Sequence, residues 1–272
     1  MGNENIWADT RLFHYTDFSA LSGILENGEL WLCNVFSMND QKEMLYFMEL
    51  LKKAVLERAG RKYHTIGDLF EQQINRLKDR PVYAVSFSRN KDDASQWERY
   101  GASGYGVSVE FDAEVLSGQL KESTILQPIF YVTDVSASPY VDVIAYYATH
   151  EFTLPEGWDS IDSVFENAWA TSSGFKHRSF ASENEIRATA LPFTIEATLG
   201  RPRFKPSKRE LKEFYAINLR QEDGWIREGL IRGVTIGPRS DVNVDTMRRY
   251  LESIPNLDPT DIEVEFSDCP LR

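Results

Sequence analysis

Short runs of β-forming residues recur along nearly the whole chain, and they constrain the fold more than any other feature. Each run is alternating or mostly apolar and is bounded by turn residues or by a helical stretch. The runs are residues 11–16, 29–34, 81–88, 104–111, 125–132, 185–198, 212–219, 227–237 and 261–266. Strands this short need partners from distant parts of the chain, so the sequence predicts one or more sheets.

Helical periodicity fills the intervals between these runs. The predicted helices are residues 17–28, 39–60, 66–78, 137–180 with a break at 154–159, and 241–254, and residues 92–101 are expected to form a short helix or a turn. The amphipathic stretch from Asn39, the expected N-cap, to Gly60 is the most regular of them. The chain has no internal repeat, low-complexity tract or linker, so we predict one α+β domain over residues 1–272.

Composition narrows the class of protein. A chain of 272 residues with 42% hydrophobic content can bury a substantial core. Its formal charge of −12 opposes general polyanion binding, which needs clustered Lys and Arg. Cys33 and Cys269 cannot make a disulfide framework, and neither a secretory leader nor an apolar run of membrane-spanning length occurs. We expect a cytoplasmic protein without membrane partners.

Most standard site motifs are missing. The glycines of GASGYG, residues 101–106, lead into a strand rather than opening a helix, so they predict a turn and not a dinucleotide-binding loop. No GxxxxGK[ST], HExxH or GxSxG occurs. The histidines His14, His64, His150 and His177 lack zinc spacing, so we predict no metal.

Four short clusters carry polar and aromatic residues: HYT (14–16), SFS (86–88), SQWERYG (95–101) and ENEIR (183–187). HYT and SFS each fall at the end of a predicted strand, where side chains emerge at the rim of a sheet and could line one cleft. Trp97 and Tyr100, three residues apart in a helical turn, could form its aromatic wall. Taken singly, each cluster also has a purely structural interpretation as core or capping residues.

The alternation in ENEIR indicates one charged face. In an extended chain Glu183, Glu185 and Arg187 point the same way, which predicts a wet cleft with a net acidic site. The alternative is a solvated strand face on which Arg187 neutralises the two carboxylates.

The clusters, taken in order, resemble a widespread bacterial family known only as a domain of unknown function. The residues that carry this resemblance are His14-Tyr15-Thr16, Ser86-Phe87-Ser88, Ser95-Gln96-Trp97 with Tyr100-Gly101, and Glu183 with Glu185 and Arg187. The helix-then-strand start at residues 18–40 and the run VTIGPRSD extend the resemblance over most of the chain.

A first-strand His-Tyr, a middle-strand Ser-x-Ser and a late Glu-x-Glu are also similar to the layout of ADP-ribosyltransferases, including the DarT-like enzymes of toxin–antitoxin and phage-defence systems. This resemblance implies a mixed sheet core with flanking helices and NAD as substrate. It implies that His14 contacts the NAD ribose, that Ser86 and Ser88 support the nicotinamide pocket, and that Glu185 is catalytic.

The chemistry agrees with that assignment. Cleavage of the nicotinamide–ribose bond passes through an oxocarbenium-like transition state, which a carboxylate near the anomeric carbon stabilises. Glu185 would stabilise the sugar cation and Glu183 would accept the proton of the acceptor. Arg187 either pairs with the pyrophosphate or holds the carboxylates, while Tyr15, Trp97 or Tyr100 stacks on a ring of NAD.

The acceptor stays open, because a first-strand His combined with SFS and Glu-x-Glu mixes features of several transferase subclasses. It is a nucleic acid or a protein, and residues 201–211 form a basic loop that could meet nucleic acid or be merely solvated. Alternatives are an NAD glycohydrolase, a metal-independent nuclease using His14 with Glu185, and a non-catalytic binding module in a defence or regulatory operon, with an antitoxin among its expected partners.

Overall fold

A computed structural model describes residues 6–35, 41–60, 64–120, 124–190, 195–206 and 211–271. The strands are β1 (Arg11–Thr16), β2 (Glu29–Asn34), β3 (Tyr83–Ser88), β4 (Val107–Asp112), β5 (Thr124–Pro128), β6 (Phe130–Val132), β7 (Phe175–His177), β8 (Glu185–Ala190), β9 (Arg203–Pro206), β10 (Leu211–Asn218), β11 (Ile231–Ile236) and β12 (Glu263–Phe266). The α-helices are α1 (Phe18–Glu26), α2 (Gln41–Ala59), α3 (His64–Leu77), α4 (Ala94–Arg99), α5 (Ala113–Gln119), α6 (Pro139–Thr149), α7 (Ile161–Ser172), α8 (Ile195–Leu199) and α9 (Val244–Ser253). Two 3-10 helices are η2 (Ala102–Gly104) and η3 (Arg178–Glu183).

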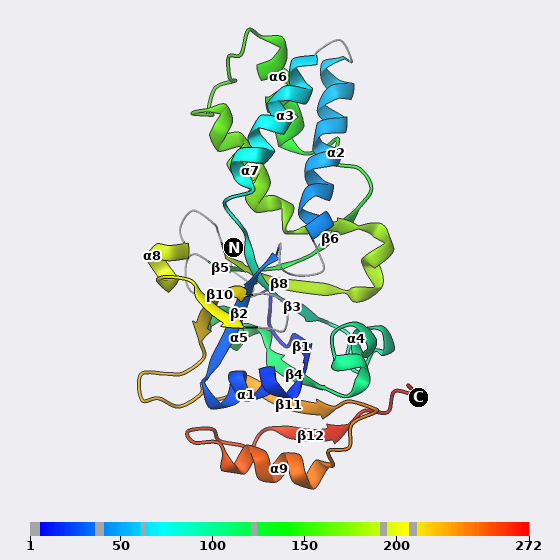
Figure 1. The fold of residues 1–272 in the computed structure, drawn as a ribbon, viewed down its shortest axis with the longest axis vertical. Coiled ribbons are helices and arrows are strands. Elements are labelled where there is room, and N and C mark those ends of the chain that lie inside the picture. Colours follow the sequence, from blue (N-terminus) through cyan, green and yellow to red (C-terminus); the bar gives the residue numbers. More distant parts are fainter. Residues whose placement is uncertain are drawn as a thin grey trace.

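A mixed sheet occupies one half of the molecule, and α2, α3, α6 and α7 form a bundle that stands on one end of it (Figure 1). The sheet runs in the order β12-β11-β4-β1-β3-β2-β10-β9, with β8 paired to β3 and β5 paired to β8. Its neighbouring strands are antiparallel except for β11 and β12. The short strands β6 and β7 pair in parallel in a second, two-stranded sheet.

Strand β3 is the point at which the sheet divides. One edge pairs with β8 along all six residues, from Tyr83 to Ser88. The opposite edge is shared, because β1 pairs with it at Ser88 and β2 pairs with it only at Ala84 and Tyr83. The strands β1 and β2 therefore diverge along this edge, and the middle of β3 faces the gap between them.

Helix α1 links these two diverging strands. Its N-cap is Asp17, whose side chain accepts a hydrogen bond from the Ala20 backbone N–H at 2.8 Å. Its apolar stripe, Leu21, Ile24 and Leu25, is buried in the core beneath the sheet. The same core is covered by α9 and α5, so this face of the sheet is closed by helices (Figure 1).

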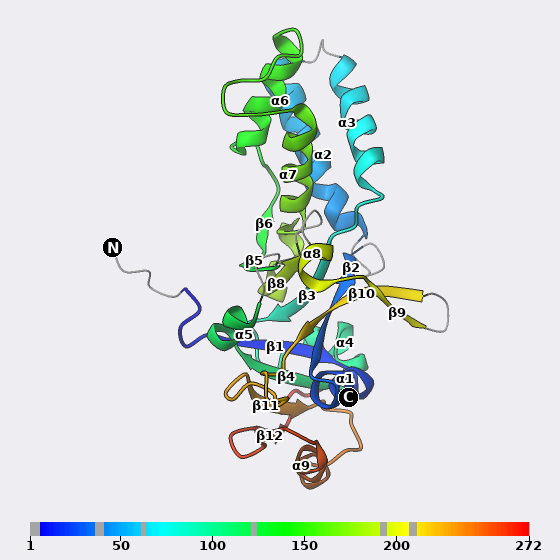
Figure 2. The same cartoon turned by 90° about the vertical axis from the view of Figure 1, so that its left-hand side faces the viewer.

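The bundle has an apolar core of its own. Figure 2 shows α2, α3, α6 and α7 side by side along the long axis of the molecule. Phe70 of α3 packs edge-to-face on Phe165 of α7, with ring centroids 4.9 Å apart, and Trp169 is fully buried beside them. Val82, which directly precedes β3, and Ala84 of β3 join this core, so the bundle and the sheet meet at the start of β3.

The predicted elements are mostly confirmed, and they make a mixed sheet with flanking helices. Asp93 caps α4 and Asn243 caps α9. The expected N-cap Asn39 lies outside the described residues. The GASGYG stretch is a turn as predicted, and Gly106 is needed there because a Cβ would collide with the carbonyl oxygen of Thr16.

Four predictions about secondary structure were wrong. The run 125–132 is not one strand, because β5 ends at Pro128 in the large sheet and β6 begins at Phe130 in the two-stranded sheet. The run 185–198 is not one strand, since β8 ends at Ala190 and α8 begins at Ile195. The helical assignment of 137–180 fails after α7, where β7 and η3 follow. The basic stretch 201–211 is not simply a loop, because it contains strand β9, which pairs with β10. Each error involves a short element whose conformation is decided by its tertiary contacts rather than by its own residue pattern.

Candidate functional site

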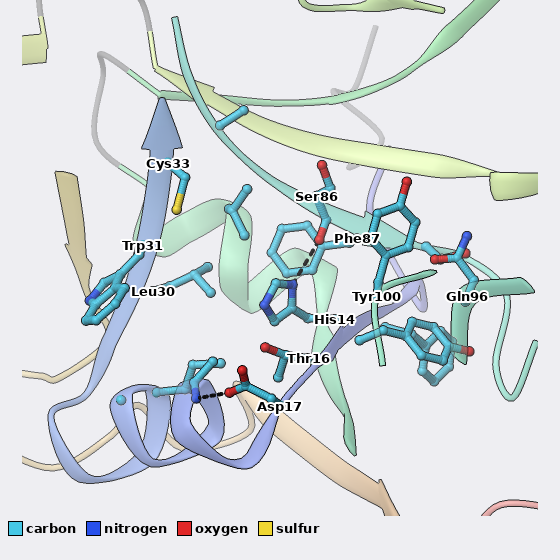
Figure 3. Close-up of a pocket in the computed structure, with 18 of the residues that line it drawn as sticks. His14, Thr16, Asp17, Leu30, Trp31, Cys33, Ser86, Phe87, Gln96 and Tyr100 are labelled. Carbon is cyan, nitrogen blue, oxygen red and sulfur yellow. Dashed lines mark hydrogen bonds between the residues drawn. The ribbon is translucent and has the colours of Figure 1, made fainter. Parts of the chain in front are cut away.

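A cavity of about 540 Å³ opens where β1 and β2 diverge (Figure 3). Residues of β1, β2, β3, α1, α4, β7 and the β9–β10 hairpin line it. Seven of the residues expected at the site are among them: His14, Tyr15, Ser86, Ser88, Tyr100, Glu183 and Glu185. Among the residues that the structure describes, Trp97 and Arg187 do not line the cavity.

His14 bridges the gap in the sheet. Its Nδ1 lies 2.9 Å from the carbonyl oxygen of Ser86, and since a carbonyl only accepts, Nδ1 carries the proton (Figure 3). Burial lowers the pKa of His14, an effect that the bond to Ser86 partly offsets. The imidazole is therefore neutral at pH 7, with Nε2 left as a hydrogen-bond acceptor for a ligand hydroxyl.

Tyr15 and Trp97 support the wall of the cavity from behind. The Tyr15 hydroxyl donates to the carbonyl of Asn90 at 2.8 Å and accepts from the Asp93 N–H at 3.1 Å. Its ring packs edge-to-face on Trp97 at 4.9 Å. Trp97 is fully buried, and its indole N–H donates to Asp92 at 2.6 Å. The expectation that Trp97 stacks on a ligand is therefore wrong, because its ring is enclosed by protein.

The two serines of the SFS cluster make their contacts through different groups, Ser88 through its hydroxyl and Ser86 through its backbone carbonyl. The Ser88 hydroxyl donates to the carbonyl of Glu183 at 2.8 Å and accepts from the Asn90 N–H at 3.0 Å. It ties β3 to the segment that carries the carboxylates. The Ser86 carbonyl accepts a hydrogen bond from His14 in the gap, so the first residue of the SFS cluster lies at the cavity floor.

The carboxylates meet although they do not share a strand. Glu183 ends η3, Asn184 follows in the left-handed conformation with φ 45°, and Glu185 begins β8. Lys176 of β7 joins them, with Nζ 2.8 Å from Glu183 Oε2 and 2.7 Å from Glu185 Oε2. Lys176 is 1% exposed and both carboxylates are below 10%, so the solvated-face interpretation is wrong.

Two arginines complete the ion-pair network. Arg187 is buried, and it pairs with Glu185 and donates to the carbonyl of Ser173 at 3.1 Å. Arg99 of α4 pairs with Glu183 at 2.7 Å, and the Tyr100 hydroxyl donates to the same oxygen at 3.2 Å. Three cations thus face two carboxylates, which corrects the prediction of a net acidic site.

This network keeps Glu185 ionised. Burial on its own raises the pKa of Glu185, but the charges of Arg187 and Lys176 and their hydrogen bonds outweigh it, so the pKa lies below the usual range. A carboxylate that stays charged in a cavity wall can stabilise a developing positive charge.

Sequence reasoning missed Lys176 and Arg99. Lys176 lies in a three-residue strand, FKH, which is too short to give a periodic signal, and it falls in a stretch predicted as helical. Arg99 lies inside the SQWERYG cluster, but a lone arginine on a short helix gives no sign of its partner. Only the fold brings both to the carboxylates.

The described residues contain no group of three or more His, Cys, Asp or Glu placed to hold a metal ion. None of the helices, as far as the structure describes them, is long and apolar enough to cross a membrane.

Comparison with known proteins gives one match. Residues 96–188, from α4 into β8, match the model of a family described as "Protein of unknown function (DUF2971)". The match includes Arg99, Lys176 and both carboxylates but leaves out HYT and SFS. No curated protein and no solved structure matched the chain.

Proposed function

We propose that the cavity binds NAD and that the protein is an ADP-ribosyltransferase-like enzyme that cleaves the bond between nicotinamide and ribose. One observation carries the proposal: His14, Ser86 and Glu185 come from three strands and line a single cavity at the division of the sheet. Its volume of about 540 Å³ is in the range of pockets that enclose small ligands.

The residues take the following roles in this proposal. Neutral His14 accepts a hydrogen bond from a ribose hydroxyl at Nε2. The glycosidic bond breaks with its electron pair leaving on nicotinamide, and the Glu185 carboxylate stabilises the ribose cation. The acceptor then attacks the anomeric carbon and loses its proton to water. Three donors already hold Glu183, so the proposal assigns it to positioning Lys176 and Glu185 rather than to proton transfer.

A non-catalytic nucleotide-binding module is the second candidate, and a specific observation favours it. Both oxygens of Glu185 contact cations, namely Lys176 and Arg187, which weakens the field of the carboxylate in the cavity. The acceptor of a transferase, nucleic acid or protein, and a role in toxin–antitoxin or phage-defence systems come from the sequence resemblance alone and belong to the proposal.

The deciding experiment follows nicotinamide release from NAD by the purified protein and by Glu185→Gln, with thermal unfolding measured with and without NAD. Glu98→Gln, an exposed change on α4, is the control. The enzyme hypothesis expects release by the wild type and by the control, and a loss of about 100-fold or more in Glu185→Gln with the fold intact.

Other outcomes separate the alternatives. Release that needs no added acceptor identifies a glycohydrolase, whereas release that depends on added nucleic acid or protein identifies a transferase. Stabilisation by NAD without release by any variant supports the binding module. Neither stabilisation nor release by the wild type rejects the cavity as an NAD site.

A further inference from the structure

Arg187, one of whose expected roles is to pair with the pyrophosphate of a ligand, is enclosed by protein instead. It is 2% exposed, and its guanidinium pairs with Glu185 and donates to the carbonyl of Ser173 at 3.1 Å. These contacts fit its other expected role, which is to hold a carboxylate. A phosphate group in the cavity would have to meet a different cation.

Arg99 of α4 presents its guanidinium at the cavity lining with donors to spare. Its side chain is 48% exposed, and Nη1 pairs with Glu183 Oε1 at 2.7 Å. In the part of the chain that the structure describes, Arg99 donates no other hydrogen bond. A guanidinium has five N–H donors in a rigid fork that matches the geometry of phosphate. The edge formed by Nε and Nη2 is therefore open to a ligand.

The position of this guanidinium is fixed from one side. Its central carbon lies 6.0 Å from the centroid of the Phe180 ring, and the Lys176 ammonium lies 5.7 Å from the same centroid. Phe180 and Glu183 both belong to η3, so one short segment holds Arg99 without using its open edge. The surrounding network has three cations for two carboxylates, so one positive charge is in excess. An anion at this end of the cavity would balance it.

Arg99 lies close enough to Glu185 for one ribose phosphate to reach both. Three contacts connect them, from Arg99 to Glu183 at 2.7 Å, from Glu183 to Lys176 at 2.8 Å and from Lys176 to Glu185 at 2.7 Å. Arg99 Nη1 is therefore within about 10 Å of Glu185 Oε2. A 5′-phosphate is bonded to the ribose itself, with its phosphorus on the order of 6 Å from the anomeric carbon. With one contact of about 3 Å at each end, the ribose phosphate spans this separation.

We propose that Arg99 binds the phosphate attached to the reactive ribose, so that the site selects ribose 5′-phosphates over unphosphorylated ribosides. Nη1 keeps its pair with Glu183, while Nε and Nη2 donate to two phosphate oxygens. This contact would fix which ribose of a dinucleotide lies at Glu185. The nicotinamide on that ribose rests on the proposed function, whereas the phosphate contact rests on the open edge of Arg99.

The test compares two ligands that differ only in this phosphate, nicotinamide mononucleotide and nicotinamide riboside. Their dissociation constants are measured by calorimetry with the wild type, with Arg99→Gln and with Arg178→Gln, which removes an exposed arginine of η3. The wild type and Arg178→Gln should bind the mononucleotide at least about tenfold more tightly than the riboside, and Arg99→Gln should bind both about equally. Lys176 and Tyr100 still hold Glu183 in Arg99→Gln, so this variant should stay folded.

The ratio of the two dissociation constants separates a phosphate contact from a structural role. If Arg99 only positions Glu183, Arg99→Gln weakens both ligands by the same factor, and an unchanged ratio overturns the proposal. Binding of neither ligand by the wild type overturns it too. A preference that depends on Arg99, without nicotinamide release from NAD, supports the phosphate contact and rejects the proposed activity. Release from NAD together with an unchanged ratio in Arg99→Gln rejects the contact and leaves the activity standing.

Discussion

The helical bundle and the cavity are stabilised in opposite ways. The interior of the bundle consists mainly of apolar side chains such as Phe47, Phe70, Phe165 and Trp169. The cavity end buries a lysine, an arginine and two glutamates within one network. Burial of apolar surface stabilises a fold directly, whereas buried ion pairs lose much of their Coulomb energy to desolvation. The charged network is therefore the part of the molecule that stability alone does not explain.

Two consecutive residues of strand β7 contact the two regions, one the bundle and the other the charged network. Phe175 packs on Phe47 of α2, with ring centroids 4.6 Å apart, and the next residue, Lys176, points to the carboxylates. Alternation along a strand sends neighbouring side chains to opposite faces, so one three-residue strand serves both interiors. The contrast between the two regions is testable at this junction. A substitution on the bundle side of β7 and one on the cavity side should change stability with a different dependence on pH.

The largest loss of stability is expected from Phe165→Ala. The change removes a fully buried ring that packs on Phe70, so unfolding should become easier by about 4 kcal/mol through lost burial and a residual cavity. No charged group is involved, and the loss should be the same at pH 5 and pH 8. Denaturant unfolding at both pH values measures it. Weaker stabilisation of the folded variant by NAD would show that the bundle and the cavity are coupled.

Lys176→Met should cost about 3 kcal/mol at pH 7, because it leaves two buried carboxylates without the cation they share. In the wild type the pKa of Glu185 is lowered, so its contribution to stability is present above pH 4.5 and is lost as the pH falls through the folded-state value. Removal of Lys176 takes away one of the charges that lower the pKa of Glu185, so this carboxyl takes up a proton at higher pH in the variant. The difference in stability between variant and wild type should therefore shrink as the pH falls from 7 towards 4.

Denaturant unfolding of Lys176→Met across this pH range measures the effect, with Lys78→Gln as a surface control. A destabilisation that stays constant with pH would mean that the methylenes of Lys176 matter and its charge does not. In that case the cavity end would resemble the bundle, and the contrast between the two regions would fail.

The bundle was largely predictable from the sequence, and the cavity was predictable in part. Helical periodicity is local information, so the stretches 39–60 and 66–78 gave helices close to those observed. Strand ends are local too, which is why HYT and SFS were expected at a rim. Their convergence follows from β1 and β3 pairing at Phe13 and Ser88, which no local pattern encodes.

The errors at the cavity come from tertiary contacts. Helical spacing put Trp97 and Tyr100 on one side, but Asp92 draws the indole of Trp97 inward while Tyr100 reaches Glu183. Period-two spacing put Glu183 on the strand, whereas Glu183 ends η3 and the strand begins only at Glu185, after the left-handed Asn184. Whether these residues bind NAD stays a prediction.

The smallest losses of stability are expected from substitutions at two helix N-caps. One cap lies beside the cavity and the other is remote from it. Asp93 caps α4 by accepting from the Ser95 and Gln96 N–H groups, and Asn243 caps α9 by accepting from the Thr246 N–H. Replacement of either residue by Ala should reduce stability by about 1 kcal/mol, measured by thermal unfolding.

The two cap variants should differ in ligand affinity. Helix α4 carries Arg99, which holds Glu183 in the network, so Asp93→Ala loosens the carboxylate end and should weaken NAD-dependent stabilisation, while Asn243→Ala should not. Equal stabilisation of both variants by NAD would show that the position of α4 has no part in binding. The ion pair between Arg99 and the buried Glu183 would then contribute to the fold alone.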